Sequence, residues 1–105
     1  MLTIDEIRRR LAGGQSRLSD HALSRVVERN IPAETIREAG VNAELVEDFP
    51  ADKYSPSCLL LGFASDGLPL HWHVSRAENP DVKIVTLYVP DPEEWYDYRV
   101  RRSAP

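Results

Sequence analysis

The stretch SCLLLGFASDGLPLHWHVS, residues 57–75, decides the fold of this chain. It begins with a near-continuous apolar run at 57–64, which is typical of a strand in the middle of a sheet. The SDG at 65–67 is a hairpin turn signal, so LPLHWHVS at 68–75 is predicted to be the return strand. Because side chains alternate along a strand, the apolar residues of the return strand are expected to face the core. They are Leu70, Trp72 and Val74.

The alternate side chains of the return strand, His71, His73 and Ser75, are then expected on the opposite, open face of the sheet. Two imidazoles at this spacing could form a metal clamp, half of a catalytic site, or a solvated strand face. Zinc would need a third ligand and usually a fourth. The candidates for these positions are His21, Cys58, Asp48 and Asp52, and none of them stands at a recognisable ligand spacing.

Helices are predicted before this hairpin. Residues 3–12 form one, with Thr3 as N-cap of a capping box. Residues 19–30 form a second, with Ser19 as N-cap, and a short third helix runs from 32 to 40. Its start at a proline and its end at a glycine fit the usual asymmetry of helix ends.

Strands dominate the second half. Residues 43–49 alternate as a strand, 81–89 are a second apolar-rich strand, and 90–100 are expected to end the sheet with a helical turn. The order predicts one α+β domain over 1–105, with two or three N-terminal helices packed on one face of a three- to four-stranded, mostly antiparallel sheet.

Composition narrows the function classes. The net charge is −4, with about +1 over residues 1–40, −4 over 41–75 and −1 over 76–105. A nonspecific nucleic-acid coat protein would be strongly basic. No run of apolar residues is long enough for a membrane span. Cys58 is the single cysteine, which excludes an internal disulfide and fits a reducing cytoplasm.

One face of the second helix carries a row of bases, since His21, Arg25 and Arg29 recur at i, i+4 and i+8. One interpretation is a solvated polar face, whose arginines pair with nearby acids. The other is a phosphate-facing row, because arginine binds phosphate oxygens in a bidentate fork and an imidazole beside it can move a proton.

Further polar residues could join a site on the open sheet face: Tyr54, Thr86 and Tyr88. Strict alternation puts Tyr88 on the same face as Thr86, Ile84 and Val82, so it could equally lie over the core. Cys58 begins the apolar strand and is expected to be a buried, inert thiol rather than a nucleophile.

The chain resembles the domain of unknown function 4258 family. The resemblance is carried by LSDHALSRVVERNIPAETI, VEDFPADKYSPSCLLLG, SDGLPLHWHV and IVTLYVPDPEEW, in that order. It covers about residues 18–96, which leaves 1–17 as an N-terminal helix and linker and 97–105 as a tail. The residues at family positions are His21, Arg25, Arg29, Pro56, Ser57, His71, Thr86 and Tyr88. His73 stands where the family usually has an apolar residue.

The resemblance implies a fold similar to the RelE and BrnT type toxins. It also implies the toxin half of a type II toxin–antitoxin pair, with messenger RNA as substrate and a YgiT-type zinc-finger protein as a possible antitoxin. Related toxins are ribonucleases that use no metal or other cofactor. In that reaction we expect His21 and His71 to transfer protons, and Arg25 and Arg29 to stabilise charge. We expect Tyr88 to donate a hydrogen bond or to stack on a base.

Contacts to substrate are expected from Thr86, Ser57, Tyr54 and His73. Two other hypotheses remain open from the sequence. The first is a binding module of the same fold that holds a partner protein without catalysis, which the acidic charge favours. The second is a zinc-dependent hydrolase that uses His71, His73 and one more ligand.

Overall fold

The computed structural model describes residues 1–103. The helices are α1 (Ile4–Ala12), α2 (Asp20–Arg29) and α3 (Ala33–Gly40). The strands are β1 (Ser16–Leu18), β2 (Glu44–Phe49), β3 (Ser57–Phe63), β4 (Pro69–Ser75), β5 (Val82–Tyr88), β6 (Trp95–Tyr96) and β7 (Val100–Arg101). The predicted α+β class is confirmed, because the three helices precede the four long strands of a mostly antiparallel sheet.

The main sheet has the strand order β1-β5-β4-β3-β2, and every neighbouring pair is antiparallel except β1 and β5. β1 was not predicted, and two of its residues, Ser16 and Arg17, were expected in the linker after the first helix. Its three residues, Ser-Arg-Leu, show no usable alternation, and its backbone is extended by pairing with the edge of β5. The predicted hairpin is confirmed, with Leu60 opposite Trp72.

The ends of the helices follow their caps. Thr3 and Glu6 form the predicted capping box of α1, with the Thr3 hydroxyl accepting from the Glu6 N–H at 3.1 Å. The Ser19 hydroxyl accepts from the Ala22 N–H at 3.0 Å at the start of α2. At its other end α2 stops at Asn30, whose φ of 51° lies in the left-handed region. These caps satisfy backbone groups that the helix itself leaves without partners.

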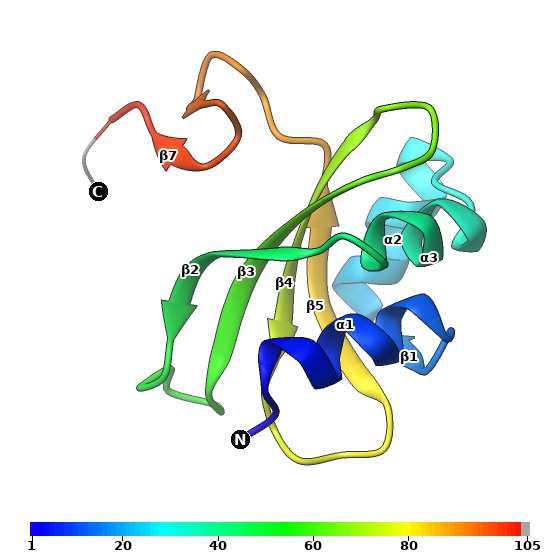
Figure 1. Ribbon diagram of the computed structural model, residues 1–105, viewed down its shortest axis with the longest axis vertical. Helices are drawn as coiled ribbons and strands as arrows, with labels where there is room; N and C mark the ends of the chain where they lie inside the picture. The colour runs from blue at the N-terminus through cyan, green and yellow to red at the C-terminus, as the bar shows by residue number, and fades with distance from the viewer. Residues whose placement is uncertain (104–105) are drawn as a thin grey trace.

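The core lies between the sheet and the helices (Figure 1). Leu70, Trp72 and Val74 are fully buried in it, as predicted. Gly62 permits the close packing of α3 on this face, because a Cβ there would lie 2.2 Å from the Ala39 carbonyl oxygen and 2.8 Å from the Trp72 ring. The sheet therefore has one face committed to the helices.

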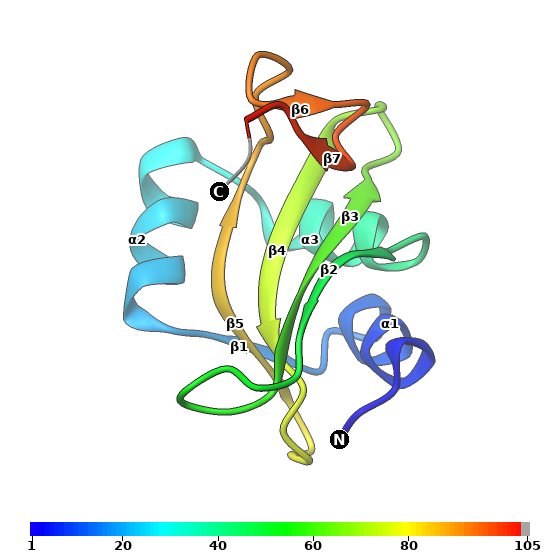
Figure 2. The same ribbon diagram turned by 90° about the vertical axis from the view of Figure 1, so that its left-hand side faces the viewer.

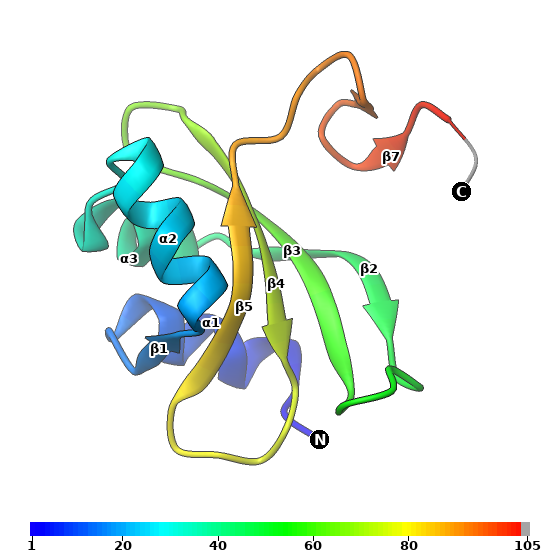
Figure 3. The same ribbon diagram turned by 180° about the vertical axis from the view of Figure 1, so that it is seen from behind.

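The opposite, open face of the sheet looks toward the viewer in Figure 2. There α2 runs along one side of it beside β5, an arrangement also seen from behind in Figure 3. The loop between β2 and β3 lies at its lower end and the small β6–β7 hairpin at its upper end. The open face is thus bordered on three sides, by α2, by the β2–β3 loop and by the β6–β7 hairpin.

The C-terminal region does not form the expected helical turn; β6 and β7 pair as an antiparallel hairpin. Asp97 and Tyr98 between them have φ of 51° and 60°, a backbone that reverses the chain tightly. Trp95 is 3% exposed because it packs onto the open face of the sheet. Residues 97–103, expected as a tail, are therefore folded, and the last two residues of that tail, 104 and 105, lie outside the described residues.

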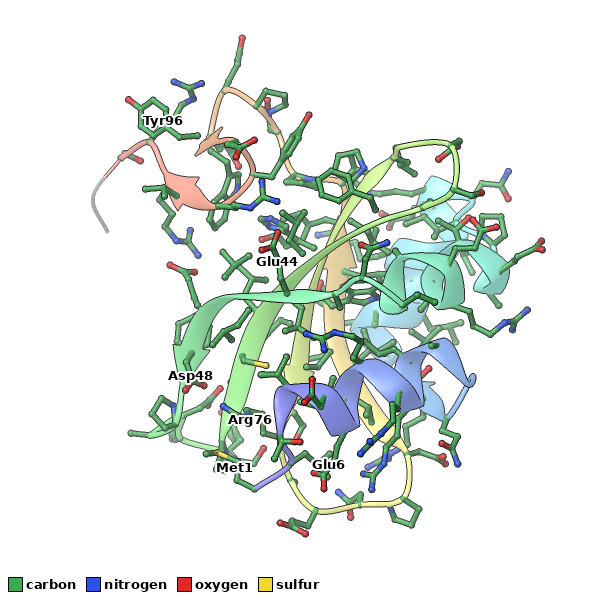
Figure 4. All side chains as sticks on the ribbon, viewed as in Figure 1. Met1, Glu6, Glu44, Asp48, Arg76 and Tyr96 are labelled. Atoms are coloured by element: carbon green, nitrogen blue, oxygen red, sulfur yellow. The ribbon has the colours of Figure 1, made fainter. Side chains whose placement is uncertain are left out.

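Two ion pairs hold the hairpin against β2. Arg101 Nη2 lies 2.9 Å from Glu47 Oε1, and Arg99 pairs with Glu44. Figure 4 shows Glu44 just above β2, on the side that faces the hairpin, whereas Tyr96 lies on the outer side of the hairpin. The inner surface of the hairpin is thus attached to the sheet by the buried Trp95 ring and by Arg99 and Arg101. None of the helices within residues 1–103 is long and apolar enough to cross a bilayer.

Candidate functional site

A cavity of about 480 Å³ opens between α2, β5 and the segment that follows β5. Its lining includes five of the predicted site residues: His21, Arg25, Arg29, Thr86 and Tyr88. Val89, Asp91 and Glu94 complete its wall. We call this the α2–β5 cavity. The structure therefore brings together residues that lie about sixty positions apart in the sequence.

The helical side of the cavity depends on how α2 packs. Ala22 is fully buried, and Val26 packs against the core from a partly buried position. Leu23 and Val27, although apolar, are 51% and 71% exposed. Because α2 lies beside β5, only a narrow stripe of its surface meets the core.

Ser19 ties α2 to β5 through two hydrogen bonds. Ser19 Oγ donates to the Val85 carbonyl oxygen at 2.7 Å while it caps the helix, and the Ser19 N–H donates to the Ile84 carbonyl at 3.0 Å. The N-terminus of α2 is thereby fixed against the strand that carries the other wall of the cavity. His21 follows two residues later, so its position is set by this contact.

A bulge in β5 decides where Tyr88 points. Val74 pairs with Ile84 and His73 pairs with Thr86, so one extra residue, Val85, is inserted between them. Strict alternation would have put Tyr88 on the face of Ile84, which is fully buried in the core. The bulge shifts the alternation by one, and Thr86 and Tyr88 line the cavity instead.

His71 is on the predicted face of β4, but the expectation that it is exposed is wrong. It is 0% exposed, because the β6–β7 hairpin covers it. Trp95 packs edge-on against the imidazole, with ring centroids 4.6 Å apart. The sequence analysis treated the residues beyond position 96 as a tail and so did not foresee this cover.

The hydrogen bonds of His71 identify its neutral tautomer. Nε2 lies 2.7 Å from the Tyr98 carbonyl oxygen, which only accepts, so Nε2 carries the hydrogen and donates. Nδ1 then accepts from the Tyr88 hydroxyl at 3.2 Å. Burial lowers the pKa of His71 and raises the pKa of Tyr88, so both groups are held in their neutral forms. His71 thus lies behind Tyr88, which separates it from the cavity.

The charge in the α2–β5 cavity is mixed. Arg25 makes a long ion pair with Glu28, at 3.4 Å between Nη1 and Oε2. Among residues 1–103, neither Arg29 nor His21 has a side-chain hydrogen bond or ion pair. Glu94 on the opposite wall offsets part of the positive charge. The predicted row of bases is therefore available to an anion, in a setting less positive than the row alone implies.

A second cluster lies on the open face near the β2–β3 loop. The Ser57 hydroxyl lies 2.6 Å from Asp52 Oδ2 and 2.8 Å from His73 Nε2. Asp52 and His73 line both a cavity of about 510 Å³, with Phe49, and a neighbouring cavity of about 380 Å³. Hydrogen bonding by Ser57, then by the Tyr54 N–H, lowers the pKa of Asp52.

The order of this cluster is not that of a nucleophilic triad. Serine lies between the carboxylate and the imidazole, whereas a triad needs the imidazole in the middle. Because the ionised Asp52 only accepts, Ser57 donates to it, and His73 Nε2–H donates to Ser57. The Ser57 hydroxyl, in a residue 2% exposed, is thus engaged on both sides and is poorly placed to attack a substrate.

The remaining residues singled out from the sequence lie either in the Asp52–Ser57–His73 cluster or in the core. Tyr54 is 88% exposed at the rim of the smaller cavity of this cluster, and Ser57 and His73 lie within it. Cys58 is fully buried on the core face, and burial raises the pKa of its thiol to about 11. It is the inert thiol that the sequence analysis expected.

The ring nitrogens of His71 and His73 point to different partners, a carbonyl and a hydroxyl. Within the part of the chain that the structure describes, no three side chains of His, Cys, Asp or Glu are grouped so as to share a metal ion. This geometry gives no support to a zinc site built on His71 and His73.

Some contributors could not be identified from sequence. Trp95 and the Tyr98 carbonyl act on His71 from a segment without recognisable periodicity. Asp52 entered the sequence analysis only as a candidate zinc ligand. Asp52 and Ser57 flank a loop that contains a proline, which indicates a turn between them. The conformation of such a loop, and so the contact between the two side chains, cannot be inferred from composition alone.

The comparisons with known proteins give one match. The family model described as Domain of unknown function (DUF4258) matches residues 18–89, which include α2 to β5 and thus the helix and strand walls of the α2–β5 cavity. No curated protein and no solved structure matches the chain significantly. The β6–β7 hairpin lies beyond the matched residues.

Proposed function

The chain belongs to this family of domains of unknown function, and we propose that it is a ribonuclease, the toxin half of a type II toxin–antitoxin pair that cuts messenger RNA in the cytoplasm. One observation carries the proposal: His21, Arg25, Arg29, Thr86 and Tyr88 line a single cavity. Two cationic guanidinium groups, an exposed imidazole and two hydroxyls are the groups that phosphodiester cleavage requires.

The reaction is an internal transfer that needs no metal ion. The 2′-oxygen of a ribose attacks the adjacent phosphorus, the bond to the 5′-oxygen breaks, and the products are a 2′,3′-cyclic phosphate and a free 5′-hydroxyl. One group must take the proton of the 2′-hydroxyl and another must give a proton to the leaving oxygen. Arg25 and Arg29 stabilise the negative charge that grows on the phosphorane oxygens.

We assign one proton transfer to His21 and the other to Tyr88. His21 is exposed at the cavity wall, where its imidazole can reach a substrate bound between α2 and β5. Tyr88 can accept a proton from substrate as it passes its own to Nδ1 of His71, because that hydrogen bond already exists. His71 is then a positioning residue that acts through Tyr88. Tyr88 then acts as the base, and His21 acts as the acid that protonates the leaving 5′-oxygen.

A specific observation also supports the second candidate, a protein-binding module. Leu23 and Val27 form an exposed apolar pair on the outer side of α2, next to the row of bases. An antitoxin, such as a small zinc-finger protein, that covered this pair would also cover the cavity mouth. The two candidates are compatible, since a toxin must bind its antitoxin, and they differ in whether RNA is cleaved.

The test is cleavage of a short RNA by the purified protein and by two variants. We expect His21→Ala and Tyr88→Phe each to lower the cleavage rate constant about 100-fold or more, which is the usual share of one general acid or base. Glu34→Gln is the control, because it removes a charge from an exposed site on α3 away from both cavities. Chelator should not change the rate. Undiminished cleavage by both variants would contradict the mechanism.

A further inference from the structure

We propose that the cavity lined by Phe49, Pro50, Ala51, Asp52 and His73 is a nucleobase subsite that selects guanine. The inference rests on the proposed function in so far as the guanine belongs to an RNA strand that passes the α2–β5 cavity. It names what the proposed function leaves open, namely which base lies beside the scissile phosphate.

The walls of this subsite suit a flat aromatic ring. Its volume is about 510 Å³, and Phe49, Pro50 and Ala51 make most of its surface apolar. Phe49 is 37% exposed, and its ring meets the His73 imidazole edge to face, with centroids 5.7 Å apart. An exposed aromatic ring beside a hollow is a stacking platform for an unpaired base.

The single carboxylate in the subsite is already organised. Asp52 Oδ2 accepts from the Ser57 hydroxyl at 2.6 Å and Oδ1 accepts from the Tyr54 N–H at 3.3 Å. Each oxygen has a second acceptor position, so the group can still accept two hydrogen bonds side by side. His73 Nε2 lies 3.7 Å from Oδ2, beyond hydrogen-bond distance, and acts on the carboxylate through the Ser57 hydroxyl.

A carboxylate that accepts two parallel hydrogen bonds selects guanine among the four bases. The Watson–Crick edge of guanine carries two adjacent donors, N1–H and the N2 amino group. Adenine and cytosine each offer one amino group next to an acceptor nitrogen, which a carboxylate would repel, and uracil offers one N–H between two carbonyls. Bidentate pairs of this kind contribute about 1–3 kcal/mol of discrimination, which is about 5-fold to 150-fold in affinity.

The subsite adjoins a third cavity that reaches β5, the strand that also lines the α2–β5 cavity. Asp52 and His73 also line the cavity of about 380 Å³, together with Lys83 and Val85, and Thr86 in the α2–β5 cavity is the next residue after Val85. Thr86 is also paired with His73 across β4 and β5. One RNA strand can therefore run along the open face, with Lys83 beside its backbone.

The experiment measures binding first, so that it does not depend on catalysis. Guanosine, inosine, adenosine and cytidine 5′-monophosphates are titrated into the protein and followed by amide NMR shifts of residues 49–57. We expect guanosine monophosphate to bind about tenfold or more tightly than the other three, since inosine lacks only the N2 amino group. In Asp52→Asn this preference should vanish, and in Glu34→Gln it should persist. Phe49→Leu should weaken all four alike.

A second arm identifies the source of the guanine. A 2′-O-methyl tetranucleotide containing one guanine cannot be cleaved, and we expect it to bind more tightly than the mononucleotide. Arg29→Gln should weaken the tetranucleotide and leave the mononucleotide unchanged, if the base belongs to RNA. Equal weak binding of all mononucleotides, or a guanine preference that survives in Asp52→Asn, would overturn the subsite. Guanine binding without any RNA cleavage would contradict the proposed function. The guanine subsite would then stand, with a free guanine nucleotide as its ligand.

Discussion

His71 and His73 are two residues apart on one strand and face the same side of the sheet, yet they have different environments. His71 is fully buried under Trp95, with both ring nitrogens hydrogen-bonded. His73 is partly exposed beside Asp52. The spacing of the two residues correctly predicted their common face. Their difference depends on which segments cover that face, and this could not be read from the strand.

At this scale the account predicts a pH effect on stability. The pKa of His71 in the folded protein lies below its ordinary value of 6.5, because burial disfavours the imidazolium. Below pH 6.5 the unfolded chain therefore binds the proton more readily than the folded one, so the free energy of unfolding falls as pH falls. Urea denaturation of wild type should show lower stability at pH 5.5 than at pH 7.5.

The matched variant is His71→Gln, whose amide can still donate to the Tyr98 carbonyl. It should lose most of this dependence between pH 7.5 and 5.5, whereas His21→Gln, at an exposed position on α2, should retain it. If His71→Gln and wild type showed the same slope, the assignment of a buried neutral imidazole would be wrong.

Among the elements, the β6–β7 hairpin changes the open face most. Its chain reversal uses two residues with positive φ, and its attachment uses Trp95 and ion pairs to β2. Sequence patterns identified the helices, the four long strands and the central hairpin, because each carries a clear apolar period or cap. The short β1 and the C-terminal hairpin carry none, and both are held in place by contacts with β5 or with the face of the sheet.

Trp95→Ala tests the role of this element. Removing a buried indole should lower the free energy of unfolding by about 3 kcal/mol and uncover His71, whose pKa should then rise toward 6.5. Urea denaturation and an NMR titration of the histidine ring protons measure both effects. Tyr96→Ala is the control, since Tyr96 is 52% exposed and lies on the outer side of the hairpin (Figure 4). Equal effects of the two variants would show that the hairpin does not shield His71.

The bulge at Val85 is a second case in which an element departs from its pattern. Alternation alone left two positions for Tyr88, over the core or on the open face. The extra residue between the Thr86 and Ile84 pairings resolves this in favour of the open face. A bulge inserts one residue into a strand without a characteristic change of residue type. The sequence of β5 therefore did not reveal it.

For the whole molecule, net charge alone argues against strong RNA binding, since it is −4. The distribution matters more, because the arginines of α2 face one cavity and the acidic segment 41–75 supplies Asp52 to another. The sequence predicted the row on α2 from its spacing and Thr86 and Tyr88 from family resemblance. Their meeting in one cavity depends on the packing of α2 beside β5.

The most direct test of the central claim, that this chain cleaves RNA by attack of a ribose 2′-hydroxyl, uses one chemical change in the substrate. Two oligonucleotides of identical sequence are incubated with the purified protein, and one of them carries a single 2′-deoxyribose 5′ to the cleaved bond. The account predicts that the all-ribose strand yields a 2′,3′-cyclic phosphate and a 5′-hydroxyl, and that the substituted strand stays intact at that bond. Cleavage of both strands at the same bond, or of neither, would contradict it.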